Sequence, residues 1–128
     1  MSYYYNKTVN GTFSNVLEKV TGLLSKEGFG ILTEIDIQQT LKKKMNVDFK
    51  KYKILGACNP PFAYKALVAE DKIGTMLPCN VIVQELGENT IEVAAVNPLA
   101  SMQAVNNTGL IDVAEKVSEK LRKVINNL

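Results

Sequence analysis

The chain has 128 residues, of which 46% are hydrophobic and 22% charged, and its net charge is +2. This length is typical of one domain, expected over residues 1–128, and it suffices to enclose a hydrophobic core. So small a net charge favours neither a strongly basic nucleic-acid clamp nor a protein that binds acidic partners. No apolar run approaches the roughly 20 residues that cross a bilayer, so no membrane association is expected.

The spacing of apolar residues predicts the elements of the fold in chain order. They are a strand over 3–10, a helix over 12–27, a strand over 29–35, a short helix over 37–45, a strand over 52–58, a helix over 61–70, strands over 79–86 and 89–96, a helical turn from 98, and a long helix over 110–128. The alternation in 29–35 places Ile31 and Ile35 on the same face of their strand. Gly87 is expected to take the positive φ of the closing hairpin.

The short helix after residue 36 raises two alternatives for the carboxylates beside it. Glu34 and Asp36 stand two apart at a strand end, so they point to one side and are a candidate acid/base pair. Asp36 is also placed to cap the helix, with Glu34 merely solvated. In the helix itself, Ile37, Leu41 and Met45 are expected to face inward.

The order βαβαβαββ, followed by a short helix and a long α-helix, predicts an α+β fold. The consecutive hairpin argues against a doubly wound parallel sheet and favours a two-layer sandwich, with helices packed on one face of a largely antiparallel sheet. Uneven cover of such a sheet, and the aromatic run 3–5 at its edge, lead us to expect a homodimer.

Two cysteines lie in similar stretches, Cys58 in "YKILGACNPPFAYKAL" and Cys79 in "GTMLPCNVIV". With the earlier stretch "GFGILTEID", they make the chain similar to the family of the domain of unknown function 302 (DUF302) over nearly its whole length. The resemblance implies a small cytoplasmic α+β domain that forms a dimer, and it implies no activity because the family has none assigned.

The cysteines are also the most interesting candidates for chemistry. The chain has no histidine, which excludes Ser-His-Asp and Cys-His triads and histidine-ligated zinc. If the two cysteine strands run antiparallel, both thiols meet at one sheet edge, near the helix expected to begin at Pro61. A helix N-terminus stabilises a thiolate or an anion. The candidate binding residues are therefore Cys58, Asn59, Pro60, Pro61, Tyr64, Lys65, Cys79 and Asn80.

Such a place suits a small anion, a thiol-reactive molecule or a soft metal ion. We assign no metal ligands, since two thiolates leave a tetrahedral site half built. The cofactor is not defined by the sequence. Free cysteines are also among the most buried residue types, so both thiols are equally well explained as small core residues.

A lysine-rich stretch, 41–53, offers a different class of function. It contains six lysines and one aspartate, with Phe49 and Tyr52 between the lysines, as in some nucleic-acid-binding surfaces. It contains no arginine, and lysines commonly decorate the solvent face of a helix, so nucleic-acid binding is the less favoured interpretation.

The sequence therefore predicts a domain that binds a small ligand or senses redox state around Cys58 and Cys79. One alternative is an enzyme that uses Cys58 as nucleophile on a small electrophile, although no base is recognisable. The other is nucleic-acid binding through the lysine-rich stretch. The amino terminus lacks the basic and apolar regions of a signal peptide, so we expect a cytoplasmic location, where both thiols stay reduced.

Overall fold

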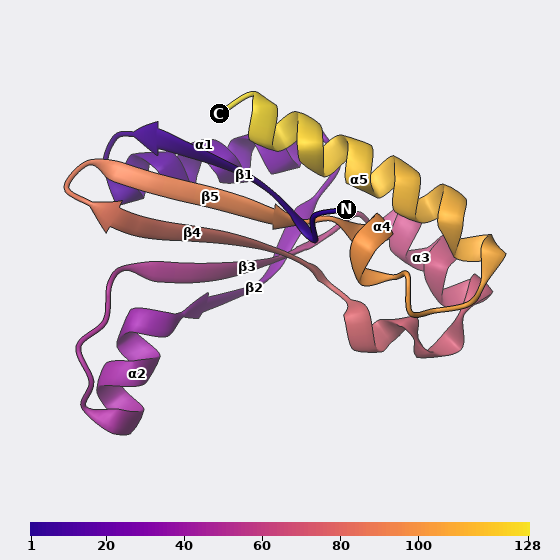
Figure 1. The fold of residues 1–128 in the computed structure, drawn as a ribbon, viewed down its shortest axis with the longest axis horizontal. Coiled ribbons are helices and arrows are strands. Elements are labelled where there is room, and N and C mark those ends of the chain that lie inside the picture. The colour runs from indigo at the N-terminus through magenta and orange to yellow at the C-terminus, as the bar shows by residue number, and fades with distance from the viewer.

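Five antiparallel strands form one sheet in the computed structural model, which describes residues 1–128 (Figure 1). The strands are β1 (Tyr4–Asn10), β2 (Gly30–Asp36), β3 (Tyr52–Cys58), β4 (Cys79–Gly87) and β5 (Thr90–Val96). Their order across the sheet is β1-β5-β4-β3-β2, and every neighbouring pair is antiparallel. The predicted α+β class and element order are confirmed.

Helices connect the strands and follow the last one. They are α1 (Phe13–Lys26), α2 (Ile37–Met45), α3 (Pro60–Ala69), α4 (Pro98–Ser101) and α5 (Ile111–Asn126), with 3₁₀ turns η1 (Asp71–Met76) and η2 (Thr108–Leu110). None of them is long and apolar enough to cross a membrane.

The core lies between one face of the sheet and helices α1 and α5. Apolar residues recur on one side of each helix, and Val20 and Leu24 of α1 and Leu121 of α5 are fully buried. Alternate strand residues meet them, including Val83 and Val93, because successive side chains of a strand point to opposite faces. Burying each such side chain stabilises the fold by about 1.5–3 kcal/mol.

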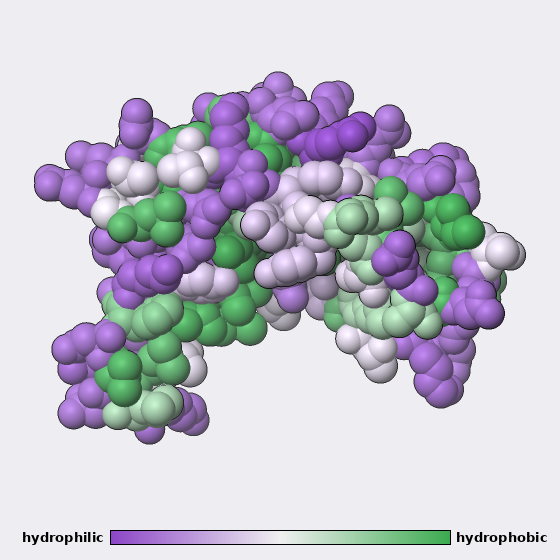
Figure 2. Space-filling model, in the orientation of Figure 1, coloured by the Kyte–Doolittle hydropathy of each residue, from purple (hydrophilic) through white to green (hydrophobic).

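The opposite face of the sheet, which we call the open face, carries the other half of each strand's side chains. They are Tyr4, Asn6 and Thr8 of β1, Glu92, Ala94 and Val96 of β5, Asn80, Ile82 and Gln84 of β4, Tyr52, Ile54 and Gly56 of β3, and Thr33 and Ile35 of β2. No helix covers the middle of this face, where residues of intermediate and apolar character gather (Figure 2). This uneven cover is the feature that led us to expect a homodimer, which stays a prediction.

Two elements differ from their predicted faces. In β2 the register shifts between Ile31 and Thr33, so Ile31 pairs with Ala57 on the covered face while Ile35 pairs with Ile54 on the open face. A bulge of this kind interrupts the period of two, and the expectation that Ile31 and Ile35 share a face was wrong.

Helix α2 buries none of its residues and projects from the body of the protein (Figure 1). Ile37 and Leu41 are half-buried beside β2 and β3, as expected, whereas Met45 is 66% exposed and its expected inward position was wrong. Helical spacing predicts that a helix forms, but it does not guarantee that another element lies against its apolar side.

Two boundaries also differ. Helix α3 begins at Pro60 rather than Pro61, because the first turn of a helix needs no backbone N–H and both prolines fit there. The β4–β5 turn consists of Glu88 and Asn89, and the positive φ of 56° belongs to Asn89 and not to Gly87, which pairs with Thr90. Asparagine tolerates the left-handed region better than most residues.

Gly56 is the tightest point of the open face and provides a test of the packing. A Cβ at this position would collide with Thr33 Oγ1 and lie 2.7 Å from Pro78 Cγ. We expect Gly56→Ala to lower the free energy of unfolding by about 1–3 kcal/mol. The matched control is Gly22→Ala in α1, where a Cβ meets nothing within 4 Å and should stabilise by about 0.5–1 kcal/mol. Equal urea midpoints for both variants would contradict this packing.

Candidate functional site

Cys58 and Cys79 lie at the same end of the sheet, as expected if their strands are antiparallel. β3 and β4 do pair antiparallel, with Ala57 opposite Cys79. Both cysteines are free, and both line a cavity of about 30 Å³ beside α3 and α5. About 30 Å³ is the share of one water molecule in liquid water, so this cavity does not admit an organic ligand as it stands.

The register separates the two thiols by one position. Cys79 faces the core beside Ala57 and is 8% exposed, whereas Cys58 comes one residue later, where β3 ends. From this position Cys58 borders the same small cavity as Ala57 and Cys79. Burial raises the pKa of Cys79 to about 11, and the nearby Cys58 adds to the rise. At neutral pH the Cys79 thiol is therefore protonated and a poor nucleophile.

The helix terminus beside Cys58 offers few donors for a thiolate or an anion. Pro60 and Pro61 are the first two residues of α3, and proline has no backbone N–H. The N–H of Ala63 already donates to the carbonyl oxygen of Asn59 at 2.9 Å. The Asn59 side chain is turned elsewhere, since its Nδ2 donates to the carbonyl oxygen of Glu27 at 3.1 Å.

The remaining predicted binding residues do not converge on the cysteines. Tyr64 is 71% exposed on α3, and Lys65 lies over the Phe62 ring with its Nζ 5.7 Å from the ring centroid. Asn80 lies on the open face, because it alternates with the inward-facing Cys79.

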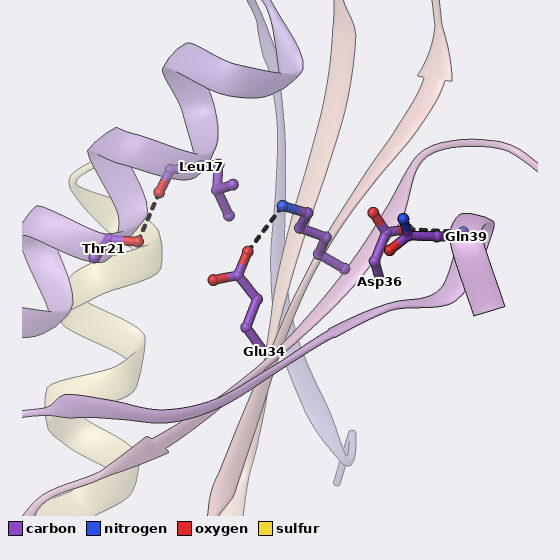
Figure 3. Close-up of polar contacts among 6 residues, drawn as sticks. Leu17, Thr21, Glu34, Asp36 and Gln39 are labelled. Atoms are coloured by element: carbon purple, nitrogen blue, oxygen red, sulfur yellow. Dashed lines mark hydrogen bonds and ion pairs between the residues drawn. The ribbon is translucent and has the colours of Figure 1, made fainter.

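Glu34 and Asp36 point to the same side of β2, but each already has a partner (Figure 3). The Glu34 carboxylate lies 2.8 Å from Lys53 Nζ. Asp36 Oδ1 accepts from the backbone N–H of Gln39 at 2.9 Å, as the N-cap of α2. These contacts correspond to the structural alternative for both carboxylates.

The lysine-rich stretch forms a separate surface on and after α2. Lys42 pairs with Asp48 at 2.9 Å, and Lys50 Nζ lies 5.7 Å from the centroid of the Phe49 ring. Nothing in these contacts is specific to a nucleic acid, and that function stays a prediction.

A concave feature lies on the open face of the sheet. This hollow, which we call the groove, measures about 430 Å³. It is lined by Tyr3, Tyr4, Tyr52, Asn80, Ile82, Gln84, Glu92, Ala94, Ala95 and Val96. Ile82 and Ala94 are directly opposite each other on β4 and β5. Because the Ala94 side chain is small, the surface is depressed there between larger side chains.

A polar row crosses the sheet at one end of the groove. Tyr52, Gln84 and Glu92 are cross-strand neighbours on β3, β4 and β5. Gln84 Nε2 donates to Glu92 Oε1 at 2.7 Å, and Asn6 Nδ2 donates to Glu92 Oε2 at 2.8 Å. The bond to Glu92 fixes the orientation of the Gln84 amide, because only its nitrogen can donate. Gln84 Oε1 is then buried without a hydrogen-bond partner.

The amino-terminal segment holds two tyrosines over the other side of the groove. The N–H of Asn97 donates to the carbonyl oxygen of Tyr3 at 2.7 Å, and Asn97 Nδ2 donates to that of Ser2 at 3.0 Å. The rings of Tyr3 and Tyr4 then pack edge to face, 4.8 Å between centroids. The pKa of Tyr52 is raised by burial first and then by the charges of Glu92 and Tyr3, so its hydroxyl stays protonated at neutral pH.

As a candidate for binding a small ligand, only Asn80 among the groove residues was identified from the sequence; Tyr52 and the aromatic run 3–5 were singled out for other roles. The outward positions of β4 and β5 alternate with buried valines, so they indicate a solvated face. Which of them lie opposite one another depends on strand order and register, and neither is visible in one sequence.

Comparisons with known proteins agree with this fold. The family model described as "Domain of unknown function DUF302" matches residues 5–128. The crystal structure of an uncharacterized conserved DUF302 protein from Bacillus stearothermophilus is similar, with a TM-score of 0.90, 24% identity, and 98% of each chain covered. No curated protein matches the chain. At this identity the structural likeness shows the fold alone.

The pKa of Cys79 predicts a loss of stability at alkaline pH. Because folding raises this pKa from 9.0 to about 11, the unfolded chain loses the thiol proton first as the pH rises. The contribution of the Cys79 thiol to the free energy of unfolding is intact below about pH 9. It declines as the pH rises to about 11, by about 2–3 kcal/mol in total. We expect Cys79→Ala to lack this decline when the free energy of unfolding is measured by urea titration between pH 8 and 11. Parallel pH curves for the two proteins would show that Cys79 does not titrate in this way.

Proposed function

The chain belongs to the DUF302 family, and we propose that it is a small-molecule-binding domain whose ligand lies in the groove of the open face. The observation that carries this proposal is the size and lining of the groove. Its volume of about 430 Å³ falls within the roughly 300–1,000 Å³ of small-molecule sites. The cavity at Cys58 and Cys79, at about 30 Å³, does not.

The lining is suited to a ligand as well. Binding sites combine apolar and aromatic walls with a few fixed polar groups. The groove has Ile82 and Ala94 in the middle, three tyrosines around it, and the hydrogen-bonded pair of Gln84 and Glu92 at one end. A ligand in this place would cover apolar surface that no helix covers. We place this activity in the cytoplasm, where both thiols stay free.

The test is a titration with small aromatic probes that fit within the groove. We expect at least one of benzamidine, benzamide and benzoate, at up to about millimolar concentration, to shift the amide resonances of Ile82, Gln84 and Ala94 in ¹⁵N–¹H spectra. Ala94→Leu should abolish these shifts, because its side chain would fill the groove. Ala104→Leu makes the same substitution at an exposed alanine outside the groove and should leave them unchanged. No shift of groove amides by any probe would overturn the proposal.

Redox sensing by Cys58 and Cys79 is the second candidate. It is favoured by one observation, that the two cysteines of the chain are free and line one cavity. In this proposal hydrogen peroxide oxidises Cys58 to a sulfenic acid and releases water. The Cys79 sulfur then attacks the Cys58 sulfur, which forms the disulfide and releases a second water. Because the thiols are one register position apart, the step needs rotation at the last residue of β3.

Intact mass and thiol counting after peroxide treatment test this candidate. We expect a loss of the mass of two hydrogen atoms, recovered on reduction, and closure that accelerates toward pH 11 as the Cys79 thiolate forms. Cys79→Ala should instead stop at the sulfenic acid. Addition of oxygen to the wild-type chain without closure would exclude a paired redox function.

A further inference from the structure

We infer that the groove selects a small organic cation with a planar donor group, such as an amidinium or guanidinium. This inference rests on the proposed function and adds the charge class of the ligand. It depends on the electrostatics of the groove and not on its volume.

Glu92 is the one formally charged side chain in the lining of the groove. It forms no ion pair with a lysine or arginine, and its two hydrogen bonds come from the neutral amides of Asn6 and Gln84. The glutamate is half-buried in the middle of the sheet, where β5 has neighbours on both sides. A partly desolvated carboxylate without a counter-ion favours a cationic ligand and disfavours an anionic one.

At the polar end of the groove, the free hydrogen-bonding positions of Glu92 and Gln84 are acceptors, and no donor of the protein occupies them. A carboxylate offers about four lone-pair positions, and Glu92 uses one at each oxygen. Gln84 Oε1 accepts nothing, which costs about 1–3 kcal/mol for a buried acceptor. A ligand with several N–H groups on one plane can donate to Glu92 and Gln84 together. Because Gln84 Oε1 is buried, a groove side chain must rotate first, and the exposed Tyr3 ring is the least enclosed of them.

The tyrosines add a second preference for positive charge. A cation near the face of an aromatic ring is attracted by the ring quadrupole. Tyr3, Tyr4 and Tyr52 all line the groove. A flat aromatic cation can therefore pack against these rings while its charged end points to Glu92.

Benzamidine, benzamide and benzoate form a matched series for the test, because they share size and shape and differ in charge. We expect benzamidine to bind at least about tenfold more tightly than benzoate, with benzamide between them, as measured from the shifts of the Gln84 and Ala94 amides. Benzamide or benzoate binding as tightly as benzamidine would overturn the cation preference and leave the proposed function standing. No binding by any probe would overturn both.

Two variants test the role of the carboxylate. Glu92→Gln keeps the size of the side chain and removes its charge, and should weaken benzamidine binding about tenfold while changing benzamide binding little. Glu88→Gln removes the same charge from the exposed β4–β5 turn and should leave binding unchanged. Equal affinity of the wild type and Glu92→Gln for benzamidine contradicts the assignment.

A second copy of the chain is the competing occupant of the open face. Light scattering during the titration distinguishes a ligand from a second copy. If a second copy covers the open face, a probe that enters the groove should dissociate the dimer into monomers. The mass should stay constant while benzamidine binds. Groove amides that shift on simple dilution, with no response to benzamidine, would assign the face to self-association instead.

Discussion

Helices cover the antiparallel sheet on one side, and this arrangement determines which strand residues form the core and which form the open face. Helices α1 and α5 both lie over the same face, and the buried valines and leucines of the strands are all directed toward them. Because strand side chains alternate, the residues that face the core determine which residues lie on the opposite face. The open face is thus a direct consequence of core formation. Its residues are not needed for the core and can therefore contact a ligand.

The shape of the groove follows from which residues the register brings side by side. The cross-strand pair Ile82 and Ala94 forms the apolar floor in the middle of the groove. Gln84 and Glu92 form the polar pair at its end. Asn97, buried after β5, holds the amino-terminal segment by donating two hydrogen bonds, to the carbonyl oxygens of Ser2 and Tyr3, and so positions Tyr3 beside the sheet. The site combines a rigid floor with one exposed aromatic ring. Such a site can admit a ligand without opening the core.

Local patterns in the sequence were sufficient for the fold class and for most elements. Helical spacing identified α1 and α5 because each has a continuous apolar side, and prolines and glycines marked the ends of other elements. The same reasoning failed at the end of α2, where Met45 is exposed although Ile37 and Leu41 are half-buried. It also failed for the bulge in β2, where one extra residue reverses the faces without any change in composition.

The candidate site was harder to predict, for a related reason. Cys58 and Cys79 are rare residues in similar stretches, so they are conspicuous in the sequence, and β3 and β4 do bring them to one end of the sheet. The groove consists of common residues whose proximity depends on three strand registers. Gln84 has no distinctive sequence context, and its unpaired oxygen follows only from the bond between its nitrogen and Glu92.

A crystal structure of the chain grown with benzamidine would show whether the groove of the open face holds an organic cation. We expect density for the ring over Ala94, with the amidinium within hydrogen-bonding distance of Glu92 and Gln84 Oε1 and the Tyr3 ring displaced from its present position. Density for benzamidine only elsewhere on the surface, or side chains of a second copy filling the groove, would contradict this expectation.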